Sequence, residues 1–170
     1  IGHVRWATHG IPHVINAHPH SSAIVSVVHN GIIENSDEIK KTLEKKGLKF
    51  KSQTDTEVIT LLITEALKTE KPIESVFKTL KQLKGSFALG IIFKNYNDII
   101  IGARRGSPLA VGYSKEENYL GSDSYALKSM TNKISYLDDG ELCVLSKDKV
   151  EFYDVKKKQI NKKVYVLTNN

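Results

Sequence analysis

The distribution of apolar and polar residues divides the chain into a polar N-terminal segment, a middle part with helical spacing and a long C-terminal series of strands. Residues 1–20 are polar and turn-prone, with Gly10, Pro12 and Pro19 as breaks. Residues 23–28 form a short apolar run, as expected for a buried strand.

The Asn30-Gly31 pair follows this predicted strand directly. Asn-Gly is the strongest short hairpin signal, because both residues tolerate the positive φ of a type I′ turn. The pair therefore predicts a hairpin turn, with Ile32 and Ile33 at the start of the return strand.

Three helices are predicted in the middle of the chain. The first spans residues 36–46, with Asn35 and Glu38 at capping-box spacing and Gly47 placed to end it in a left-handed conformation. The second and third helices are predicted from residues typical of a helix N-terminus.

Thr54 and Glu57 also have capping-box spacing, and the helix after them runs to about Lys68. Its apolar residues occupy a wide arc, which is typical of a largely buried helix. Pro72 begins the third helix. Between the first two helices, residues 48–51 predict a short strand.

Strand patterns dominate after Gly85. Residues 86–93 form a continuous apolar run, as in a strand covered on both faces. Further short strands are predicted at 99–103, 109–113, 119–121, 134–137, 141–145 and 150–153, with a brief helix at 125–130 and an exposed tail from Lys156. This order indicates an α+β fold of four layers, αββα, with two stacked antiparallel sheets between helices.

The composition is that of a globular domain: of 170 residues, 40% are apolar and 26% are charged. The chain has one cysteine, Cys143, which excludes an internal disulfide framework and a cysteine-rich zinc site and favours a cytoplasmic setting. The longest apolar run is far shorter than the ~20 residues of a membrane span. We therefore expect no membrane partner.

The net charge is +6. The lysines are scattered over the predicted elements and no aromatic residues interleave with a basic stripe, so the charge does not favour nucleic-acid binding. We expect no nucleic-acid partner.

Candidate chemistry begins in the N-terminal segment, because all six histidines and the only tryptophan, Trp6, lie within residues 1–29. The planar fork of Arg5 fits a carboxylate or phosphate, although for this residue taken alone pairing with a structural acid is the favoured interpretation. Thr8 and His9 supply further donors in a turn.

The histidines also leave a metal-binding alternative open. His9 and His13 are four residues apart but are separated by Pro12, and no acidic ligand stands at a familiar spacing. A non-catalytic domain that binds a small ligand or a metal through this cluster is therefore the second hypothesis.

Two further groups suggest acyl chemistry. Asn30 and Gly31, if they are not simply a turn, offer an amide N–H and a backbone N–H as an oxyanion hole. Asp55, if it is not simply a helix cap, can hold an ammonium group. With Arg5 for a carboxylate, these groups describe recognition of an amino acid whose side-chain carbonyl is attacked.

Four blocks resemble, in order, the glutaminase domain of the glutamine–fructose-6-phosphate aminotransferases, a family of class II glutamine amidotransferases. They are residues 5–10 (RWATHG), 16–20 (NAHPH), 27–35 (VVHNGIIEN) and 54–58 (TDTEV). The resemblance covers essentially the whole chain. It implies an N-terminal-nucleophile hydrolase fold, L-glutamine as substrate and no cofactor.

The resemblance also implies a role for each matching residue. The substrate-binding residues are Arg5 for the α-carboxylate, Asp55 for the α-ammonium, and Thr8 and His9 in the pocket. The oxyanion hole is formed by Asn30 and Gly31, His18 has an orienting role, and Trp6 gates the passage of ammonia.

The nucleophile of this family is an N-terminal cysteine, in a segment that would precede Ile1. Cys143 lies in a strand pattern and is not expected to replace it. We therefore expect residues 1–170 to be a partial glutaminase domain, truncated at its N-terminus and inactive alone. In the complete family architecture, a sugar-isomerase domain binds fructose 6-phosphate and carries any homo-oligomer contact.

Overall fold

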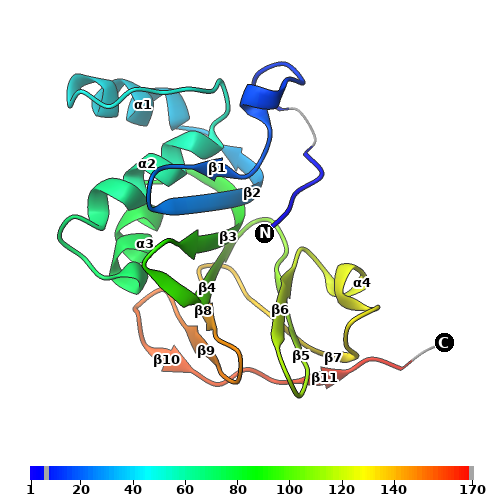
Figure 1. Cartoon of the computed structure of the whole chain (residues 1–170). Helices are drawn as coiled ribbons and strands as arrows, with labels where there is room; N and C mark the ends of the chain where they lie inside the picture. The colour runs from blue at the N-terminus through cyan, green and yellow to red at the C-terminus, as the bar shows by residue number, and fades with distance from the viewer. Residues whose placement is uncertain (6–7, 169–170) are drawn as a thin grey trace.

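The computed structural model describes residues 1–5 and 8–168, and these form two antiparallel sheets that stack face to face (Figure 1). The strand order is β1-β2-β3-β4-β8-β9-β10 in the large sheet and β11-β7-β5-β6 in the small one. The strands are β1 His20–Ser21, β2 Val25–Ile33, β3 Gly85–Phe93, β4 Tyr96–Arg105, β5 Ala110–Tyr113, β6 Asn118–Gly121, β7 Lys133–Tyr136, β8 Leu142–Leu145, β9 Val150–Tyr153, β10 Gln159–Ile160 and β11 Tyr165–Val166.

Helices cover both outer faces of this pair of sheets (Figure 1). Helices α2 (Thr56–Ala66) and α3 (Pro72–Leu80) pack on the large sheet, and α1 (Ser36–Lys45) lies beside α2. The short α4 (Ser124–Leu127) contacts β5 and β6 of the small sheet. A 3₁₀ turn, η1 (Val14–Asn16), precedes β1.

Three apolar clusters fill the three spaces between these layers. The largest joins the helices to the large sheet and includes Ile59 of α2 and Leu89 of β3. The second lies between the two sheets and includes Ala88 and Cys143, and the third joins Leu127 of α4 to the small sheet. Adjacent residues of β3 enter different clusters because successive side chains of a strand point to opposite faces. The predicted α+β fold with αββα layers is therefore confirmed.

The first two predicted helices are confirmed to within about two residues at each end, and the third begins at Pro72 as predicted and ends at Leu80. Gly47 has the expected positive φ of 87°, and Pro72 occupies the first turn of α3. The strand predictions from residue 86 to residue 153 are also confirmed.

Among the described residues, no helix is long and apolar enough to cross a bilayer.

The predicted hairpin at Asn30-Gly31 is wrong. Both residues lie inside the continuous strand β2, where Asn30 pairs with Ala88 and Gly31 with Phe87 of β3. Gly31 has a φ of 120°, and a Cβ added there would lie 2.3 Å from the Ser86 carbonyl oxygen. The glycine therefore permits close approach of two strands, and a nine-residue ladder outweighs the local turn preference.

Neither predicted capping box forms. The Asn35 side chain instead accepts from Lys84 N–H at 2.8 Å and donates to the Gln82 carbonyl at 2.8 Å, which ties α1 to the start of β3. The Glu57 carboxylate accepts from the N–H groups of Lys51 and Ser52.

One local prediction outside the helices is wrong: residues 48–51 form no strand, and the Lys51 N–H donates to Glu57 Oε1 at 2.8 Å. The prediction that the tail is exposed is confirmed, and Val164 and Val166 are among its exposed residues. Two short strands of this tail were not predicted: β10 pairs with β9, and β11 pairs with β7. Two-residue strands are too short to leave a periodic signal in a sequence.

Candidate active site

A cavity of about 280 Å³ lies where the N-terminal segment, β2 and the start of α2 meet. Most of the residues that the sequence singled out line it: Arg5, Thr8, His9, His18, Asn30, Gly31 and Asp55. Trp6, the predicted gate, lies outside the described residues. The fold thus brings together groups that are up to fifty residues apart in the chain.

One edge of β2 forms a wall of this cavity. N–H groups of alternate residues point to the same edge of a strand. Past Val27, β1 no longer pairs with this edge, so other groups reach it. His29 N–H donates to His18 Nδ1 at 3.4 Å, and Ile33 N–H donates to Asp55 Oδ2 at 2.8 Å. The Gly31 N–H lies between these two and points to the same edge.

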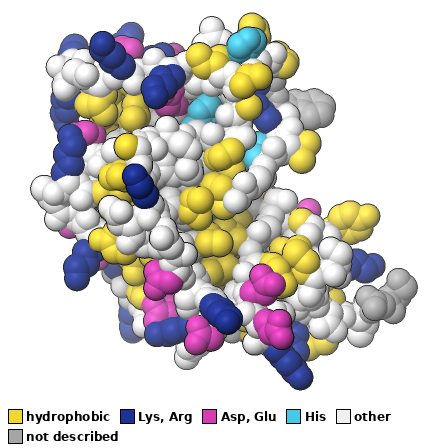
Figure 2. Space-filling model, in the orientation of Figure 1, with side chains coloured by type: hydrophobic (Ala, Val, Ile, Leu, Met, Phe, Trp, Pro, Cys, Tyr) yellow, Lys and Arg dark blue, Asp and Glu magenta, His cyan; other side chains and the backbone are white. Residues whose placement is uncertain are grey.

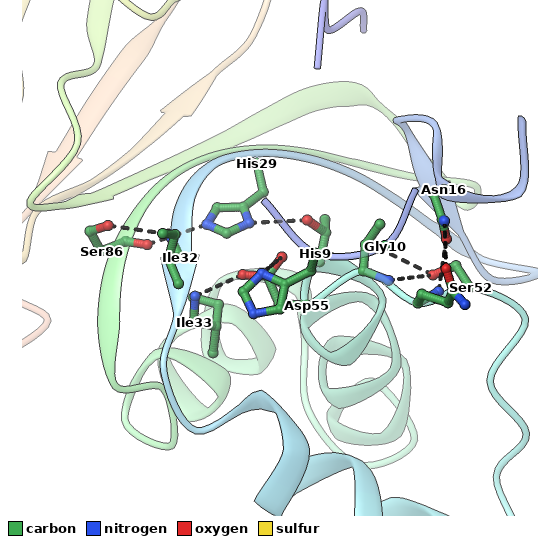
Figure 3. A network of polar contacts seen from close by, with 12 residues as sticks. His9, Gly10, Asn16, His29, Ile32, Ile33, Ser52, Asp55 and Ser86 are labelled. Carbon is green, nitrogen blue, oxygen red and sulfur yellow. Dashed lines mark hydrogen bonds and ion pairs between the residues drawn. The ribbon is translucent and has the colours of Figure 1, made fainter. Parts of the chain in front are cut away.

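The Asp55 carboxylate is buried, with 5% of its surface exposed, and it lies directly before α2. Its Oδ2 accepts from Ile33 N–H, and its Oδ1 lies 3.9 Å from His9 Nδ1 (Figure 3). The His9 Nδ1 atom is buried and has no hydrogen-bond partner among the described residues. One carboxylate oxygen and one imidazole nitrogen therefore face a space that a ligand with a polar group can occupy.

Arg5 joins the N-terminal segment to the next loop. Its guanidinium donates to the carbonyl oxygens of His9 at 2.6 Å, Gly10 at 3.3 Å and Ile11 at 3.4 Å. These contacts come from Nη1 and Nη2 and occupy at most three of the five guanidinium N–H groups. Arg5 is thus held rigidly at the cavity wall while it retains donors for an anion.

Asn16 holds the loop that carries His9 and Gly10. Its buried side chain donates to the Ile11 carbonyl at 3.0 Å and to Gln53 Oε1 at 3.1 Å, and it accepts from Gln53 N–H at 2.8 Å. This bridge connects the N-terminal loop to the residues that precede α2 (Figure 3). It fixes His9 relative to Asp55.

A second cavity of about 470 Å³ adjoins the first and shares His3, Arg5, His29 and Asn30 with it. It extends between the two sheets, where it is lined by apolar residues such as Leu109 and Leu120. Figure 2 shows apolar side chains gathered in a hollow beside the N-terminal segment, with histidines close by. The polar cavity therefore continues into an apolar one.

Comparison with known proteins assigns the chain that forms this cavity to a family. The family described as "Glutamine amidotransferase domain" matches residues 15–129. The chain belongs to the glutamine amidotransferase domain family.

Curated relatives of this amidotransferase domain carry the name "Glutamine--fructose-6-phosphate aminotransferase [isomerizing]". The protein of Zymomonas mobilis is 52% identical over 165 residues, which cover 96% of this chain and 27% of the relative. That of Mesorhizobium japonicum is 51% identical over 164 residues, again 96% of this chain and 27% of the relative. The chain thus spans about a quarter of the length of these relatives.

Two solved structures share the fold. A glutamine phosphoribosylpyrophosphate amidotransferase from B. subtilis matches with a TM-score of 0.74 at 24% identity, over 92% of this chain and 35% of that one. A protein described as the allosteric regulatory enzyme of purine biosynthesis matches with a TM-score of 0.75 at 25% identity, over 90% of this chain and 34% of that one. The expected N-terminal-nucleophile hydrolase fold is confirmed.

Several histidines of the amidotransferase domain lie close together at the wall of the cavity. The His18 ring stacks on His3 with centroids 4.2 Å apart and meets His20 edge-on at 5.0 Å. Burial, together with the neighbouring histidines and Arg5, lowers the pKa of His18 to about 3. Burial also lowers the pKa values of His20 and His29. These imidazoles are therefore neutral at pH 7.

This neutrality predicts loss of stability in mild acid. Below about pH 6.5 histidines in the unfolded chain bind protons, whereas the same histidines in the folded protein stay neutral because their pKa values are lowered. The free energy of unfolding therefore falls as the pH falls toward 3. We expect His18 alone to contribute a loss of about 1–2 kcal/mol between pH 6.5 and 5, from the linkage slope of ~1.4 kcal/mol per pH unit. Urea unfolding at pH 7.5 and 5.0 measures this loss, and equal midpoints for the wild type would contradict it. His18→Gln should reduce the pH dependence of the unfolding midpoint.

Cys143 lies away from this site. It is fully buried in β8, where it pairs with Gly102, and burial raises the pKa of its thiol to about 12. The predicted burial in a strand is confirmed. Among the described residues, no group of three or more His, Cys, Asp or Glu side chains is arranged to hold a metal ion.

The sequence patterns did not single out His3, Thr56 or Ser86, which also line the cavity. Thr56 stands in the block that was interpreted as a helix cap, and its hydroxyl contacts His29 Nδ1 at 3.0 Å. Ser86 only begins an apolar run and carries no signal of its own. For His3, the clue is its place in the histidine-rich segment, two residues before Arg5.

Proposed function

We propose that the cavity binds L-glutamine and that this domain is the ammonia-releasing part of a glutamine–fructose-6-phosphate aminotransferase. The observation that carries the proposal is the convergence of three different groups on one cavity: the Asp55 carboxylate, the Arg5 guanidinium and the N–H donors of Asn30 and Gly31. The names of the relatives support the same assignment.

Each group matches one part of glutamine. Asp55 Oδ1 accepts from the α-ammonium, and the remaining donors of Arg5 take the α-carboxylate. Thr8 and His9 complete the wall around these groups. The side-chain carbonyl oxygen of glutamine then points to Asn30 Nδ2 and Gly31 N–H, which stabilise the negative charge that develops there when the amide carbon is attacked.

Attack on the amide carbon requires a thiolate about 3 Å away, within reach of the oxyanion donors. The resemblance assigns this step to an N-terminal cysteine, which forms a thioester as ammonia leaves, and water then releases glutamate. A sugar-isomerase domain with fructose 6-phosphate as acceptor, and any oligomer contact through it, belongs to the same proposal. His18 has an orienting role through its contact with His29 N–H.

Ligand binding to Asp55 is the first test. We expect Asp55→Asn to weaken L-glutamine binding about 10- to 100-fold in calorimetry, because a charge-assisted hydrogen bond contributes ~1.5–3 kcal/mol. Glutaramate, which is glutamine without the α-amino group, should bind equally to wild type and variant. Asp148→Asn is the matched control, since Asp148 is exposed in a turn. Equal glutamine affinity for Asp55→Asn and wild type would refute the assignment.

Ammonia release is the second test. We expect residues 1–170 alone to release no ammonia from glutamine above background, because their single thiol is buried with a raised pKa. Ammonia release that disappears in Cys143→Ser would instead make Cys143 the nucleophile. Activity that survives this substitution would point to a nucleophile of another residue type.

A further inference from the structure

His3 lies between the backbone of Arg5 and the side chain of Asn30. The Arg5 N–H donates to His3 Nδ1 at 2.8 Å, and His3 Nε2 lies 2.5 Å from Asn30 Oδ1. His3 is 27 residues from Asn30 in the chain. This short contact links the N-terminal segment to the strand that carries the oxyanion donors.

The first of these contacts determines which nitrogen of His3 carries the proton. A backbone N–H can only donate, so His3 Nδ1 must accept. A neutral imidazole that accepts at Nδ1 carries its hydrogen on Nε2. The Nε2–H therefore donates to Asn30.

The second contact then determines how the Asn30 amide is turned. Only the oxygen of a carboxamide accepts, so the atom that faces His3 Nε2–H is Oδ1. The Nδ2 group, with its two hydrogens, is directed away from His3. Asn30 is exposed at the cavity, so without His3 little else distinguishes the two ends of its amide.

The His3 ring is itself held in place. Its face stacks on His18, with an angle of 19° between the ring planes. Arg5 has a φ of 45°, which is uncommon for a residue other than glycine, and its N–H donates to His3 Nδ1. The guanidinium of Arg5 is in turn anchored to the His9 carbonyl. Backbone, ring and side chain thus all fix the position of Nε2.

We propose that His3 is a positioning residue that sets the orientation of the Asn30 carboxamide, so that Nδ2 and Gly31 N–H donate together to the carbonyl oxygen of the substrate. This inference rests on the proposed function. His3 touches no reacting atom. If the amide turned over, Oδ1 would face the developing oxyanion and repel it, so the loss of His3 should lower kcat more than it raises KM.

Nuclear magnetic resonance of residues 1–170 tests the geometry without any activity. In ¹⁵N-labelled protein we expect His3, assigned by comparison with His3→Gln, to carry its hydrogen on Nε2. We also expect His3→Asn to shift the side-chain amide resonances of Asn30. A hydrogen on Nδ1, or unchanged Asn30 resonances, would overturn the proposal.

Kinetics of the complete natural protein test the consequence. We expect His3→Asn to lower kcat for glutamine hydrolysis about 10- to 100-fold with KM within about twofold, since complete loss of an oxyanion donor costs ~10²–10³. His3→Gln should restore most of the activity, because its amide nitrogen lies near the position of Nε2 and can donate. His13→Asn is the control, since this exposed histidine does not line the cavity.

The outcomes separate the two proposals. A wild type that releases no ammonia would refute the proposed function, and the resonance measurements would still decide the role of His3. An active wild type whose His3→Asn variant keeps its kcat would overturn the positioning role alone. Where His3→Asn binds glutamate as tightly as wild type, its fold is intact and a lower kcat reports the lost orientation.

Discussion

Replacement of Asn30 by Ala is expected to lower kcat for glutamine hydrolysis by the complete natural protein about 100- to 1,000-fold, with a much smaller change in KM. The amide of Asn30 donates to an oxygen that gains negative charge only as the amide carbon is attacked, so its contribution appears in the transition state. Steady-state measurement of ammonia release provides both constants. The backbone of Asn30 continues to pair with Ala88 in the variant, so the strand should persist.

Two matched variants sharpen this test. Asn30→Asp keeps the shape of the side chain but replaces the donor by a second oxygen, so we expect a loss at least as large. Asn97→Ala removes an exposed asparagine from β4, away from the cavity, and should leave kcat unchanged. An unaltered kcat in Asn30→Ala would show that Asn30 is only a strand residue.

Replacement of Gly31 by Ala should lower the free energy of unfolding by about 3 kcal/mol. The new Cβ would lie 2.3 Å from the Ser86 carbonyl oxygen and 2.9 Å from its Oγ, so β2 and β3 would have to separate. Overpacking of this kind costs ~1–3 kcal/mol, and the positive φ adds ~1–2 kcal/mol. Urea unfolding measures the change.

Gly47→Ala is the control that isolates the close approach from the backbone conformation. Gly47 has a φ of 87°, and a Cβ added there meets nothing within 4 Å. We expect it to lose only about 1 kcal/mol, from the left-handed conformation alone. If both variants are equally destabilised, then β2 and β3 separate at little cost and the contact with Ser86 does not explain the glycine.

Elements that depend on residues close together in the sequence were predicted correctly, and those that depend on residues far apart in the sequence were not. Helices α2 and α3 were predictable because burial imposes a period on the residues between Thr56 and Leu80, and Pro72 marks a start by its own covalent geometry. The turn predicted at Asn30-Gly31 does not form, because the residues that keep β2 extended there, Ala88 and Phe87, lie nearly sixty residues further along the chain.

The residues of the candidate site were likewise predicted only in part. Arg5, Thr8, His9, His18, Asn30, Gly31 and Asp55 were named from blocks of sequence, and all of them line one cavity. Their roles toward glutamine remain predictions. His3 was not named, because nothing within its own block shows that its imidazole meets Asn30.

The sequence by itself determined the layered α+β fold, the family and most residues of the cavity, since burial periodicity and short motifs are local properties of the chain. Only the tertiary structure decided which groups hold those residues in place. Asn16 reaches Gln53, Asp55 reaches Ile33 N–H, and His3 reaches Asn30. These hydrogen bonds depend on distances between segments 22 to 37 residues apart. The two partners of such a hydrogen bond are not separated by any fixed number of residues, so the sequence does not show which atoms will pair. The pairs can be identified only in the packed structure of sheets and helices.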